Sequence, residues 1–449
     1  MEYLNDSELF FILGTLVVGA PILLLITLGL STILGKPLRE HIIARATYLS
    51  IIIGITPCIL ILILMILKDL RFVPIELGNL AYVPGTTFHF NLKFIFDRLS
   101  VPFCLLTFVL CGIVGTFTRR YLHKEIGYNR FFICYAIFFC GMIFSTLAGT
   151  IETLFIGWEL VGLSSALLIA YFHQHKNPVQ GGLRVWSIYR FGDAAFLLAV
   201  LIMHHMTGHG EFDSLIESGP WPLGTISLTG VEATWIGLLL LVSACAKSGL
   251  VPFSGWLPRA MEGPTPSSAV FYGSLSVHLG AYMLLRLSPI VDASIVFQIS
   301  IIIIGVISAI FGSVLSKVQP DVKSSLGFAS MTQVSIIFIE IGLGFRYLAL
   351  VHIMGHACLR TLQLLRAPSI LKDYHSFENA IGETVEYKIS WFEKLSEPNQ
   401  VRLYRLAYER GGFDNFIDRM IVIPFQNAFK YALKNEEKWL EILNSKKIK

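Results

Sequence analysis

Residues 239–266 read LLLVSACAKSGLVPFSGWLPRAMEGPTP, an apolar run with one lysine, Lys247, followed by a series of prolines and glycines. A lone charge at the centre of a membrane-spanning helix costs about 2.5 kcal/mol or more, so such a residue marks a functional site. Irregular backbone at membrane depth is tolerated only where protein or a water-filled cavity surrounds it. We therefore expect an interruption beside Lys247, with the break at Pro252, Gly263, Pro264 and Pro266. The alternative is a plain loop, which we expect in any case for Pro264 to Pro266.

Composition places the chain among polytopic membrane proteins. Hydrophobic residues make up 54% and charged residues 15%, with a mean hydropathy of +0.66, whereas soluble domains carry about 25% charged residues. The net charge of +4 is small, and no basic face indicates nucleic-acid binding. The seven cysteines form no CxxC pair or His/Cys cluster. Because the sequence also lacks a P-loop, a Rossmann glycine fingerprint and an iron-sulfur framework, we expect no cofactor and no catalysis by this chain alone.

At roughly 20 apolar residues per span, the sequence predicts an all-α protein with about eleven transmembrane helices. We expect them near residues 9–34, 42–67, 98–117, 130–149, 151–172, 184–206, 232–253, 266–287, 294–316, 325–344 and 347–366. Alternate loops carry lysine and arginine, whereas the N-terminus is acidic. Because basic loops face inward, we expect a multi-pass protein of the inner (plasma) membrane with an external N-terminus and a cytoplasmic C-terminus.

Three regions follow from this pattern. Residues 1–97 hold two helices and then, from residue 68, a stretch of β-favouring residues that predicts a short external hairpin. Residues 98–366 hold the other predicted spans, with the polar residues inside them. Residues 367–449 have mixed charge and predict a cytoplasmic or interfacial tail with helices near 376–410 and 414–446. The second of these helices is amphipathic, which suits a position on the membrane surface or on a partner subunit.

Charged residues inside the predicted spans are the candidates for an ion path. Glu152 and Glu159 are seven residues apart and share one helix face. Arg190 and Asp193 are three apart on the next helix. By spacing alone, Lys247 can compete for Asp193 or reach Glu159. A buried carboxylate, whose pKa depends on burial and on nearby cations, suits a proton carrier. Two interpretations stay open: a proton path, which we favour, and fixed ion pairs that hold helices together.

Histidines and an arginine continue this polar series. His278 lies in the eighth predicted helix, and His352, His356 and Arg360 follow at intervals of four on one face of the eleventh. Histidine titrates near neutral pH, which suits a proton relay. A His-x3-His pair is also found in metal sites, but no third ligand stands nearby in the sequence. We therefore favour a proton-conducting or structural line without metal.

Together these residues resemble the proton-translocating, antiporter-like membrane subunits of respiratory complex I (chain L type) and of Mrp-type cation/proton antiporters. The resemblance covers roughly residues 90–366. It rests on GWELVGLSS at 157–165, RFGD at 190–193, AKS at 246–248, Pro252, WL at 256–257, MEGPTP at 261–266, DVK at 321–323 and HA at 356–357. A run of such motifs in this order is specific for the family.

The resemblance implies a fold of two inverted five-helix repeats, each with a broken helix. It implies that Glu159 and Lys247 are the key glutamate and lysine of the first half-channel, and that Asp193 modulates the lysine. Lys323, within the DVK match, is placed on the same proton path. Arg360 falls where the family usually has a lysine, and it keeps a charge that does not readily deprotonate.

Two departures from the family pattern change these expectations. The family's histidine after the GPTP turn is Tyr272 here, and His278 lies about one and a half turns further on, so we expect the relay to run through His278. The sequence also leaves the membrane after the eleventh predicted helix. We therefore expect a truncated second repeat without the helix that bears the terminal lysine. The segment GFDNFIDR at 412–419 nonetheless resembles the family's sequence before its C-terminal lateral helix.

A short chain of this type resembles the membrane subunits of DAB-type inorganic carbon transporters, the DabB subunits. That resemblance implies a large soluble, zinc-containing, carbonic-anhydrase-like partner on the cytoplasmic side, and H+ or Na+ flow that drives CO2 hydration. An energy-coupling subunit of a carbon (CO2/bicarbonate) uptake complex is thus the first interpretation. Two alternatives stay open: a proton-pumping subunit of an NADH-quinone oxidoreductase or hydrogenase-type complex, and an Mrp-type cation/proton antiporter component.

Overall fold

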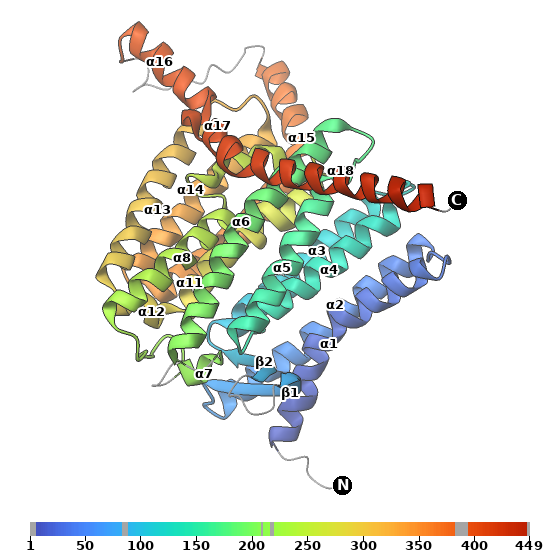
Figure 1. The fold of residues 1–449 in the computed structure, drawn as a ribbon, viewed down its shortest axis with the longest axis vertical. Coiled ribbons are helices and arrows are strands. Elements are labelled where there is room, and N and C mark those ends of the chain that lie inside the picture. The colour runs from blue at the N-terminus through green and yellow to red at the C-terminus, as the bar shows by residue number, and fades with distance from the viewer. Residues whose placement is uncertain (1–5, 83–88, 208–209, 216–219, 382–393, 447–449) are drawn as a thin grey trace.

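The computed structural model describes residues 6–82, 89–207, 210–215, 220–381 and 394–446. Within these ranges, eleven helical segments are long and apolar enough to cross a membrane, which confirms the predicted polytopic helical fold. They pack as a bundle of long helices (Figure 1).

The first six spans are α1 (Asp6–Ile33), α2 (Glu40–Leu67), α3 (Ser100–Tyr121), α4 (Tyr128–Leu147), α5 (Ile151–Ile169) and α6 (Lys176–Thr207). The short α7 (Phe212–Leu215) follows, then α8 (Gly230–Ser248), and later α12 (Ser288–Ala293), α13 (Ile295–Ser316), α14 (Val322–Gly342) and α15 (Arg346–Ile381).

The two ends of the bundle carry different structures. At one end, β1 (Phe72–Tyr82) and β2 (His89–Asp97) form an antiparallel hairpin, as the sequence predicted for residues 68–97. At the opposite end lie the C-terminal helices (Figure 1). We call these two ends the hairpin side and the tail side. Odd and even spans run in opposite directions between them, as single crossings of a membrane require.

A buried lysine contributes to holding the hairpin on the bundle. The ammonium of Lys93 donates hydrogen bonds to Glu211 at 2.9 Å and to Asp213 at 2.6 Å. Burial alone lowers the pKa of Lys93, but these carboxylates more than offset that effect, so its pKa lies above its usual range. A charged Lys93 therefore ties β2 to the segment between α6 and α8.

Burial separates central spans from peripheral ones. The eighth span, from Thr265 to Arg286, is completely buried, whereas only 28% of the most apolar window of α13 is buried. The outward faces of α2 and α13 are rich in isoleucine and leucine, which suits contact with lipid. The seventh and eighth spans, which carry Lys247 and His278, thus lie in the interior, where a charge meets protein rather than lipid.

The seventh span is interrupted directly after Lys247, as the sequence predicted. Its helix α8 ends at Ser248, and Gly249 follows with a φ of 67°, a conformation that glycine adopts without strain. Irregular backbone then passes Pro252 into the 3-10 turn η1 (Phe253–Trp256) and the short α9 (Leu257–Ala260). All of η1 is buried, so protein surrounds the irregular backbone.

The eighth span is also irregular, and its start corrects one expectation. It consists of α10 (Thr265–Ser267), the π-helical η2 (Ser268–Ser274), the 3-10 turn η3 (Ser276–His278) and α11 (Leu279–Arg286). The expectation of a loop for Pro264 to Pro266 is wrong, because Pro266 lies in the buried first turn of α10 and Pro264 precedes it. Proline fits a first helical turn because its missing N–H would have no partner there.

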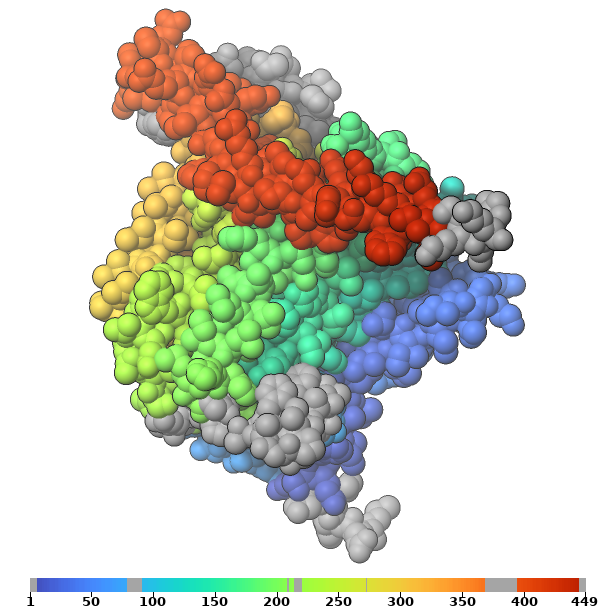
Figure 2. Space-filling model, in the orientation of Figure 1, coloured from blue at the N-terminus to red at the C-terminus, as the bar shows by residue number. Residues whose placement is uncertain are grey.

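The tail forms helices that lie over one end of the bundle. Helix α15 continues past its apolar part to Ile381, and part of the predicted helix at 376–410 lies outside the described residues. Then come α16 (Glu397–Tyr408), η4 (Arg410–Gly412), α17 (Phe413–Ile417), η5 (Asp418–Val422) and α18 (Ile423–Lys446). Helix α18, in red, runs across the tail side, and α16 projects away from it (Figures 1 and 2). The predicted helical tail is thus present, with α18 amphipathic as expected.

Candidate functional site

Lys247 lies in the interior, and no carboxylate of the described residues pairs with it. Its residue is 1% exposed, and its ammonium donates a 2.7 Å hydrogen bond to the backbone carbonyl of Trp158 on α5. It also faces the rings of Trp158 and Tyr189, whose centroids lie 4.8 Å and 4.6 Å away. Among the described residues, no carboxylate comes within 4.0 Å of this ammonium. The charge is therefore stabilised by one carbonyl dipole and two aromatic faces.

The two carboxylates expected near Lys247 pair with another cation. Arg190 on α6 forms ion pairs with both Glu159 on α5 and Asp193 on its own helix, the latter at 2.6 Å. The indole N–H of Trp158 donates a 2.7 Å hydrogen bond to Asp193. Trp158 thus contacts Lys247 with its carbonyl and Asp193 with its indole. The sequence did not assign Trp158 or the bridging position of Arg190, although both belong to the matched motifs.

Glu152 lies away from this cluster. It shares the α5 face with Glu159, but seven residues of helix separate the two by about 10 Å along the axis. At the hairpin end of α5, its carboxylate lies 3.7 Å from the ring nitrogen of His204. The structure therefore places Glu152 with a histidine near the hairpin side and not with Lys247.

A second polar group forms around three histidines. His278 in η3 and His356 on α15 lie ring to ring, with His278 Nε2 3.0 Å from His356 Nδ1. The other ring nitrogen of His278 contacts the carbonyl of Ser274. Because a carbonyl only accepts hydrogen bonds, neutral His278 carries its proton on Nδ1, and its Nε2 accepts from His356. The two rings therefore form a directed hydrogen-bonded pair inside the bundle.

His352 continues this group toward the hairpin side. Its Nδ1 lies 2.9 Å from Glu340 and its Nε2 3.1 Å from the amide oxygen of Gln333, both on α14. His352 thus bridges Glu340 and Gln333 through its two ring nitrogens. Glu340 was missed in the sequence, although it stands in the apolar run IIFIEIG, the same signal that singled out Lys247.

Lys323 and Arg360 lie closer to the tail side than the three histidines do. The ammonium of Lys323 donates to the carbonyls of Met261 and Gly263, at 3.0 Å and 3.1 Å. It therefore holds the backbone between the two broken spans. Arg360 is 6% exposed on α15 and packs near Gly273 of η2. The side chain of Tyr272 lies outside the described residues.

Buried hydroxyl groups occupy the space between the Lys247 cluster and the histidines. Helix α8, with Lys247, packs against α11 and η3 of the histidine span. The hydroxyls of Ser243 and Ser248 are buried and have no partner among the described side chains and backbone. The buried hydroxyls of Tyr189 and Ser276 lie close to each other. Buried polar groups of this kind are normally satisfied by ordered water. The arrangement is a polar passage between the two clusters.

The tail is clamped onto the break beside Lys247. Arg184 on α6 forms ion pairs with Asp414 and Asp418, and Arg410 pairs with Asp414 at 2.8 Å. Asp414 reaches so close to η1 that a Cβ at Gly255 would lie 1.7 Å from its carboxylate oxygen. The GFDNFIDR segment thus contacts the irregular backbone through Asp414, which its sequence alone did not show.

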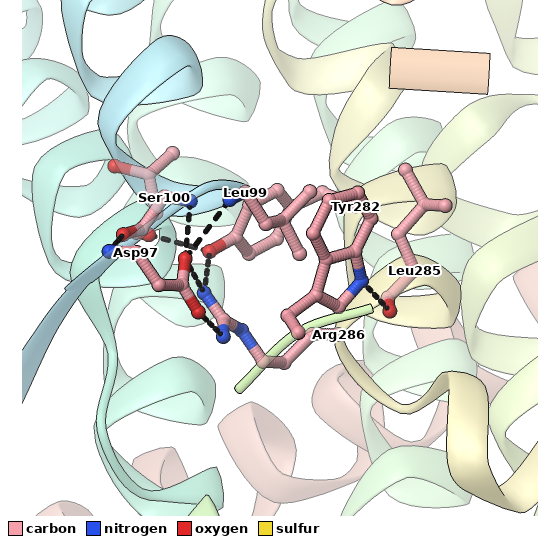
Figure 3. A network of polar contacts seen from close by, with 8 residues as sticks. Asp97, Leu99, Ser100, Tyr282, Leu285 and Arg286 are labelled. Atoms are coloured by element: carbon pink, nitrogen blue, oxygen red, sulfur yellow. Dashed lines mark hydrogen bonds and ion pairs between the residues drawn. The ribbon is translucent and has the colours of Figure 1, made fainter. Parts of the chain in front are cut away.

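A second buried ion pair lies far from Lys247, on the hairpin side. Asp97 at the end of β2 and Arg286 at the end of α11 are 1% and 3% exposed and approach to 2.5 Å. Figure 3 shows the carboxylate between the guanidinium and the backbone N–H groups of Leu99 and Ser100, which donate to it at 3.0 Å and 2.8 Å. Arg286 also donates to the hydroxyl of Tyr282. The sequence analysis missed this pair, although Arg286 is a charge in an apolar helix.

Comparisons with known proteins agree on one family. A family model for "NADH:quinone oxidoreductase/Mrp antiporter, TM" matches residues 148–383, more than half of the chain. One for "NADH-Ubiquinone oxidoreductase (complex I), chain 5 N-terminus" matches residues 82–132. NADH-quinone oxidoreductase subunit L of Neisseria meningitidis is 31% identical over 316 residues, 68% of this chain and 47% of the relative. NAD(P)H-quinone oxidoreductase chain 5 of Synechocystis sp. is 27% identical over 68% of this chain and 44% of the relative.

The fold agrees with the same comparison. The solved structure of the Mrp complex from Dietzia sp. has a chain that matches 84% of this one with a TM-score of 0.63 at 22% identity, and 38% of that chain is covered. The chain spans less than half the length of the curated relatives it matches.

Two broken spans, with a buried lysine beside the first, accompany the helical fold of an antiporter-like membrane protein. The chain belongs to the NADH:quinone oxidoreductase/Mrp antiporter transmembrane family, which confirms the predicted family. The narrower resemblance to subunits of DAB-type carbon transporters stays a prediction, as does the relation by inverted repeats.

Proposed function

We propose that this chain is the ion-translocating membrane subunit of a larger complex, and that Lys247 carries the translocated charge. The observation that carries this proposal is the lone ammonium in the interior, 2.7 Å from a backbone carbonyl and beside irregular backbone. An ammonium paired to a carboxylate is held in its charged form, whereas one held by a carbonyl and aromatic rings is closer to losing its proton. Lys247 is therefore the group best placed to change charge state.

The charged residues around Arg190 offer a way to change whether Lys247 is protonated. Protonation of Glu159 weakens its ion pair with Arg190 and leaves the guanidinium to Asp193 alone. Because Trp158 contacts both Asp193 and Lys247, a change at Asp193 alters the surroundings of the ammonium directly. Glu159 thus acts as the acceptor of an incoming proton and Asp193 as the group that tunes Lys247.

The pair of His278 and His356 provides the next groups that can accept a proton from Lys247. A proton released by Lys247 meets the buried hydroxyls of Ser248 and Ser276 and then His278. From His356 the polar residues continue through His352 to Glu340, two residues before the hairpin end of α14. Arg360 keeps a fixed charge beside this line. The sequence of groups therefore leads from the middle of the bundle toward the hairpin side.

A flux experiment tests the proposed translocation. The complex that contains this chain is reconstituted in vesicles, and proton and sodium movements are followed separately with a pH-sensitive dye and a sodium-sensitive dye. We expect proton flux that disappears with Lys247→Arg, because arginine keeps the charge but does not readily deprotonate. Flux of wild-type size in that variant would overturn the role of Lys247.

The identity of the complex is a separate part of the proposal. The relatives are subunits of NADH-quinone oxidoreductases and the Mrp complex, which favours a redox-linked proton pump or a cation/proton antiporter. An inorganic carbon uptake complex with a soluble, zinc-containing, carbonic-anhydrase-like subunit is the second candidate. It is favoured by the tail, because α18 exposes large apolar side chains such as Phe429 and Trp439, 62% and 66% exposed, on the tail side. These offer a platform for a soluble partner, with the tail side facing the cytoplasm.

Purification of the intact complex through a tag at the N-terminus distinguishes these candidates. Quinone-reductase or Mrp subunits in the purified material would support the first candidates, and a soluble subunit that contains zinc would support the second. Deletion of residues 397–449 is expected to leave an inserted protein that loses a soluble partner. Normal recovery of the partner with the truncated chain would show that the tail is not the docking platform.

A further inference from the structure

A crevice between α2 and α3 opens near the tail side, away from the charged interior. It has a volume of about 310 Å³, and its lining includes Arg45, Tyr48, Ile51, Gly112 and Arg119. Ligand sites in proteins begin at roughly 300 Å³. Its place beside α2 opens it to the lipid, because α2 is one of the less buried spans, with 39% of its apolar window buried. The crevice is thus large enough for part of a lipid-sized molecule.

The lining residues separate charge from apolar surface along the crevice. On α2, Arg45 lies about 9 Å nearer the tail side than Ile51, and on α3 Arg119 lies about 10 Å nearer than Gly112, by the rise of a helix. Positions 112, 116 and 119 share one face of α3, and positions 44, 48 and 51 share one face of α2. The crevice is therefore basic at its tail-side mouth and apolar at its inner end.

The two arginines at the mouth lack an acidic partner. Arg45 and Arg119 are exposed, and neither forms an ion pair within 4.0 Å in the part of the chain that the structure describes. By contrast, Arg184, Arg190 and Arg286 all pair with aspartates. Two guanidinium groups that line one cavity repel each other, and an anion between them removes that repulsion and takes two bidentate contacts.

Two glycines of α3 keep the crevice open. A Cβ at Gly112 would lie 3.3 Å from Ile51, and one at Gly115 would lie 3.5 Å from Thr47. A methyl group therefore meets α2 at ordinary or slightly tight contact, and any larger side chain at these positions fills the space. Thr116 lines the crevice at an exposed position, so a larger side chain there enters the crevice without disturbing the packed core.

From this geometry we propose that the crevice binds one anionic phospholipid. Its phosphate lies between Arg45 and Arg119, and one acyl chain passes Ile51 toward the outward apolar face of α2, where Ile52, Ile59 and Ile63 are 39% to 46% exposed. A free phosphate would use the arginines but not the apolar end. Basic pockets between membrane helices bind anionic lipid head groups. Near an anionic membrane surface, each arginine raises the binding affinity about fivefold.

Native mass spectrometry of the purified complex in nanodiscs tests the proposal. Nanodiscs of phosphatidylcholine are compared with nanodiscs that also contain phosphatidylglycerol, and bound lipid is counted after release from the disc. We expect phosphatidylglycerol to be retained by the wild type, and the double substitution Arg45→Gln and Arg119→Gln to lower its affinity about 25-fold. Arg120→Gln is the matched control, since this exposed neighbour does not line the crevice, and it should bind as the wild type does.

A second variant and a soluble competitor keep the test decisive. Thr116→Leu leaves both arginines in place and fills the crevice, so it should also lower retention, whereas glycerophosphate in solution should not compete with the lipid. Retention of phosphatidylglycerol at the wild-type level in both Thr116→Leu and the double arginine variant would overturn the proposal, as would wild-type binding of phosphatidylcholine equal to that of phosphatidylglycerol. Cross-linking from position 48 to another protein subunit in a lipid-free crevice would show that the crevice is a protein interface instead.

Discussion

Two buried charged groups in this molecule differ in how they are satisfied. Arg286 has Asp97 at 2.5 Å, and the same carboxylate accepts two backbone N–H groups. Lys247 has one backbone carbonyl and two aromatic faces, while the nearby carboxylates pair with Arg190. Burial is the same in both places, since all three of Lys247, Asp97 and Arg286 are at most 2% exposed as residues. The difference is that Arg286 has a carboxylate partner, whereas Lys247 has none among the described residues.

This difference answers the question of whether buried charges here hold helices together or conduct ions. A pair with both partners fixed resists any change of protonation, so Asp97 and Arg286 join β2 to α11 as structural residues. An ammonium without a carboxylate is stabilised less and can exchange its proton at lower cost. The interpretation as a fixed ion pair that holds elements together therefore suits Asp97 and Arg286, and the interpretation as part of a proton path suits Lys247.

The largest expected effect is on stability, at the hairpin-side pair. Asp97→Asn keeps the acceptor for the backbone of α3 but leaves the Arg286 guanidinium buried without a counter-charge. We expect a loss of about 3 to 5 kcal/mol in the free energy of unfolding, measured by thermal or denaturant unfolding of the detergent-solubilised protein. The double variant Asp97→Asn, Arg286→Met should recover most of that loss. Recovery of nothing in the double variant would show that the pair is not the source of the effect.

The next effect is on transport, at Lys247. Lys247→Met removes a charge that has no carboxylate partner among the described residues, and it keeps most of the buried side-chain volume. We therefore expect little change in unfolding and a loss of ion flux of about 100-fold, the scale of a positioned proton-transfer group. Flux and melting temperature are measured on the same preparation. Strong destabilisation with near-normal flux per folded molecule would reverse the division between the two charged groups.

A smaller effect is expected at Glu159. Glu159→Gln preserves the side-chain volume and removes the proton acceptor that pairs with Arg190. The glutamine amide oxygen can still accept a hydrogen bond from Arg190, and Arg190 keeps its ion pair with Asp193, so the substitution should cost little stability. We expect roughly a tenfold lower flux with an unchanged melting temperature, using Glu152→Gln as the control from the same helix face. If Glu159→Gln conducts normally but melts earlier, Glu159 is structural.

The smallest effect concerns acid stability. Burial raises the pKa of Asp97, but the charge of Arg286 and the backbone donors lower it further, so the net pKa lies below its ordinary value of 3.8. A carboxyl with a lowered pKa stabilises the fold above its unfolded pKa, and this stability is lost as pH falls through the folded pKa. We expect the difference in melting temperature between wild type and Asp97→Asn to be constant from neutral pH down to about pH 4. It should narrow only under more acidic conditions, and narrowing near neutral pH would contradict this assignment.

Much of the site could be predicted from spacing within single helices. Glu159, Asp193, Lys247, His278 and His356 each stand out as polar residues in an apolar run. The structure buries all of them except Glu159, which is partly exposed. Glu340 and Arg286 carry the same signal and were missed because they fall outside the matched motifs. Arg45 and Arg119 lie at the tail-side ends of two spans, and no pattern in the sequence indicated that they line one crevice.

The sequence by itself determined the number of spans, the hairpin and the break after Lys247, because hydrophobic length, β-favouring residues and prolines act locally on the chain. Only the tertiary structure decided which charge meets which. Asp97 and Arg286 are 189 residues apart, and Arg184 and Asp418 are 234 apart. The packing of helices that are distant in the sequence, together with the length of the side chains, decides such partners. The spacing of residues within one helix carries no information about them. For that reason the sequence located Lys247, and only the fold showed that Arg190 takes its expected carboxylates.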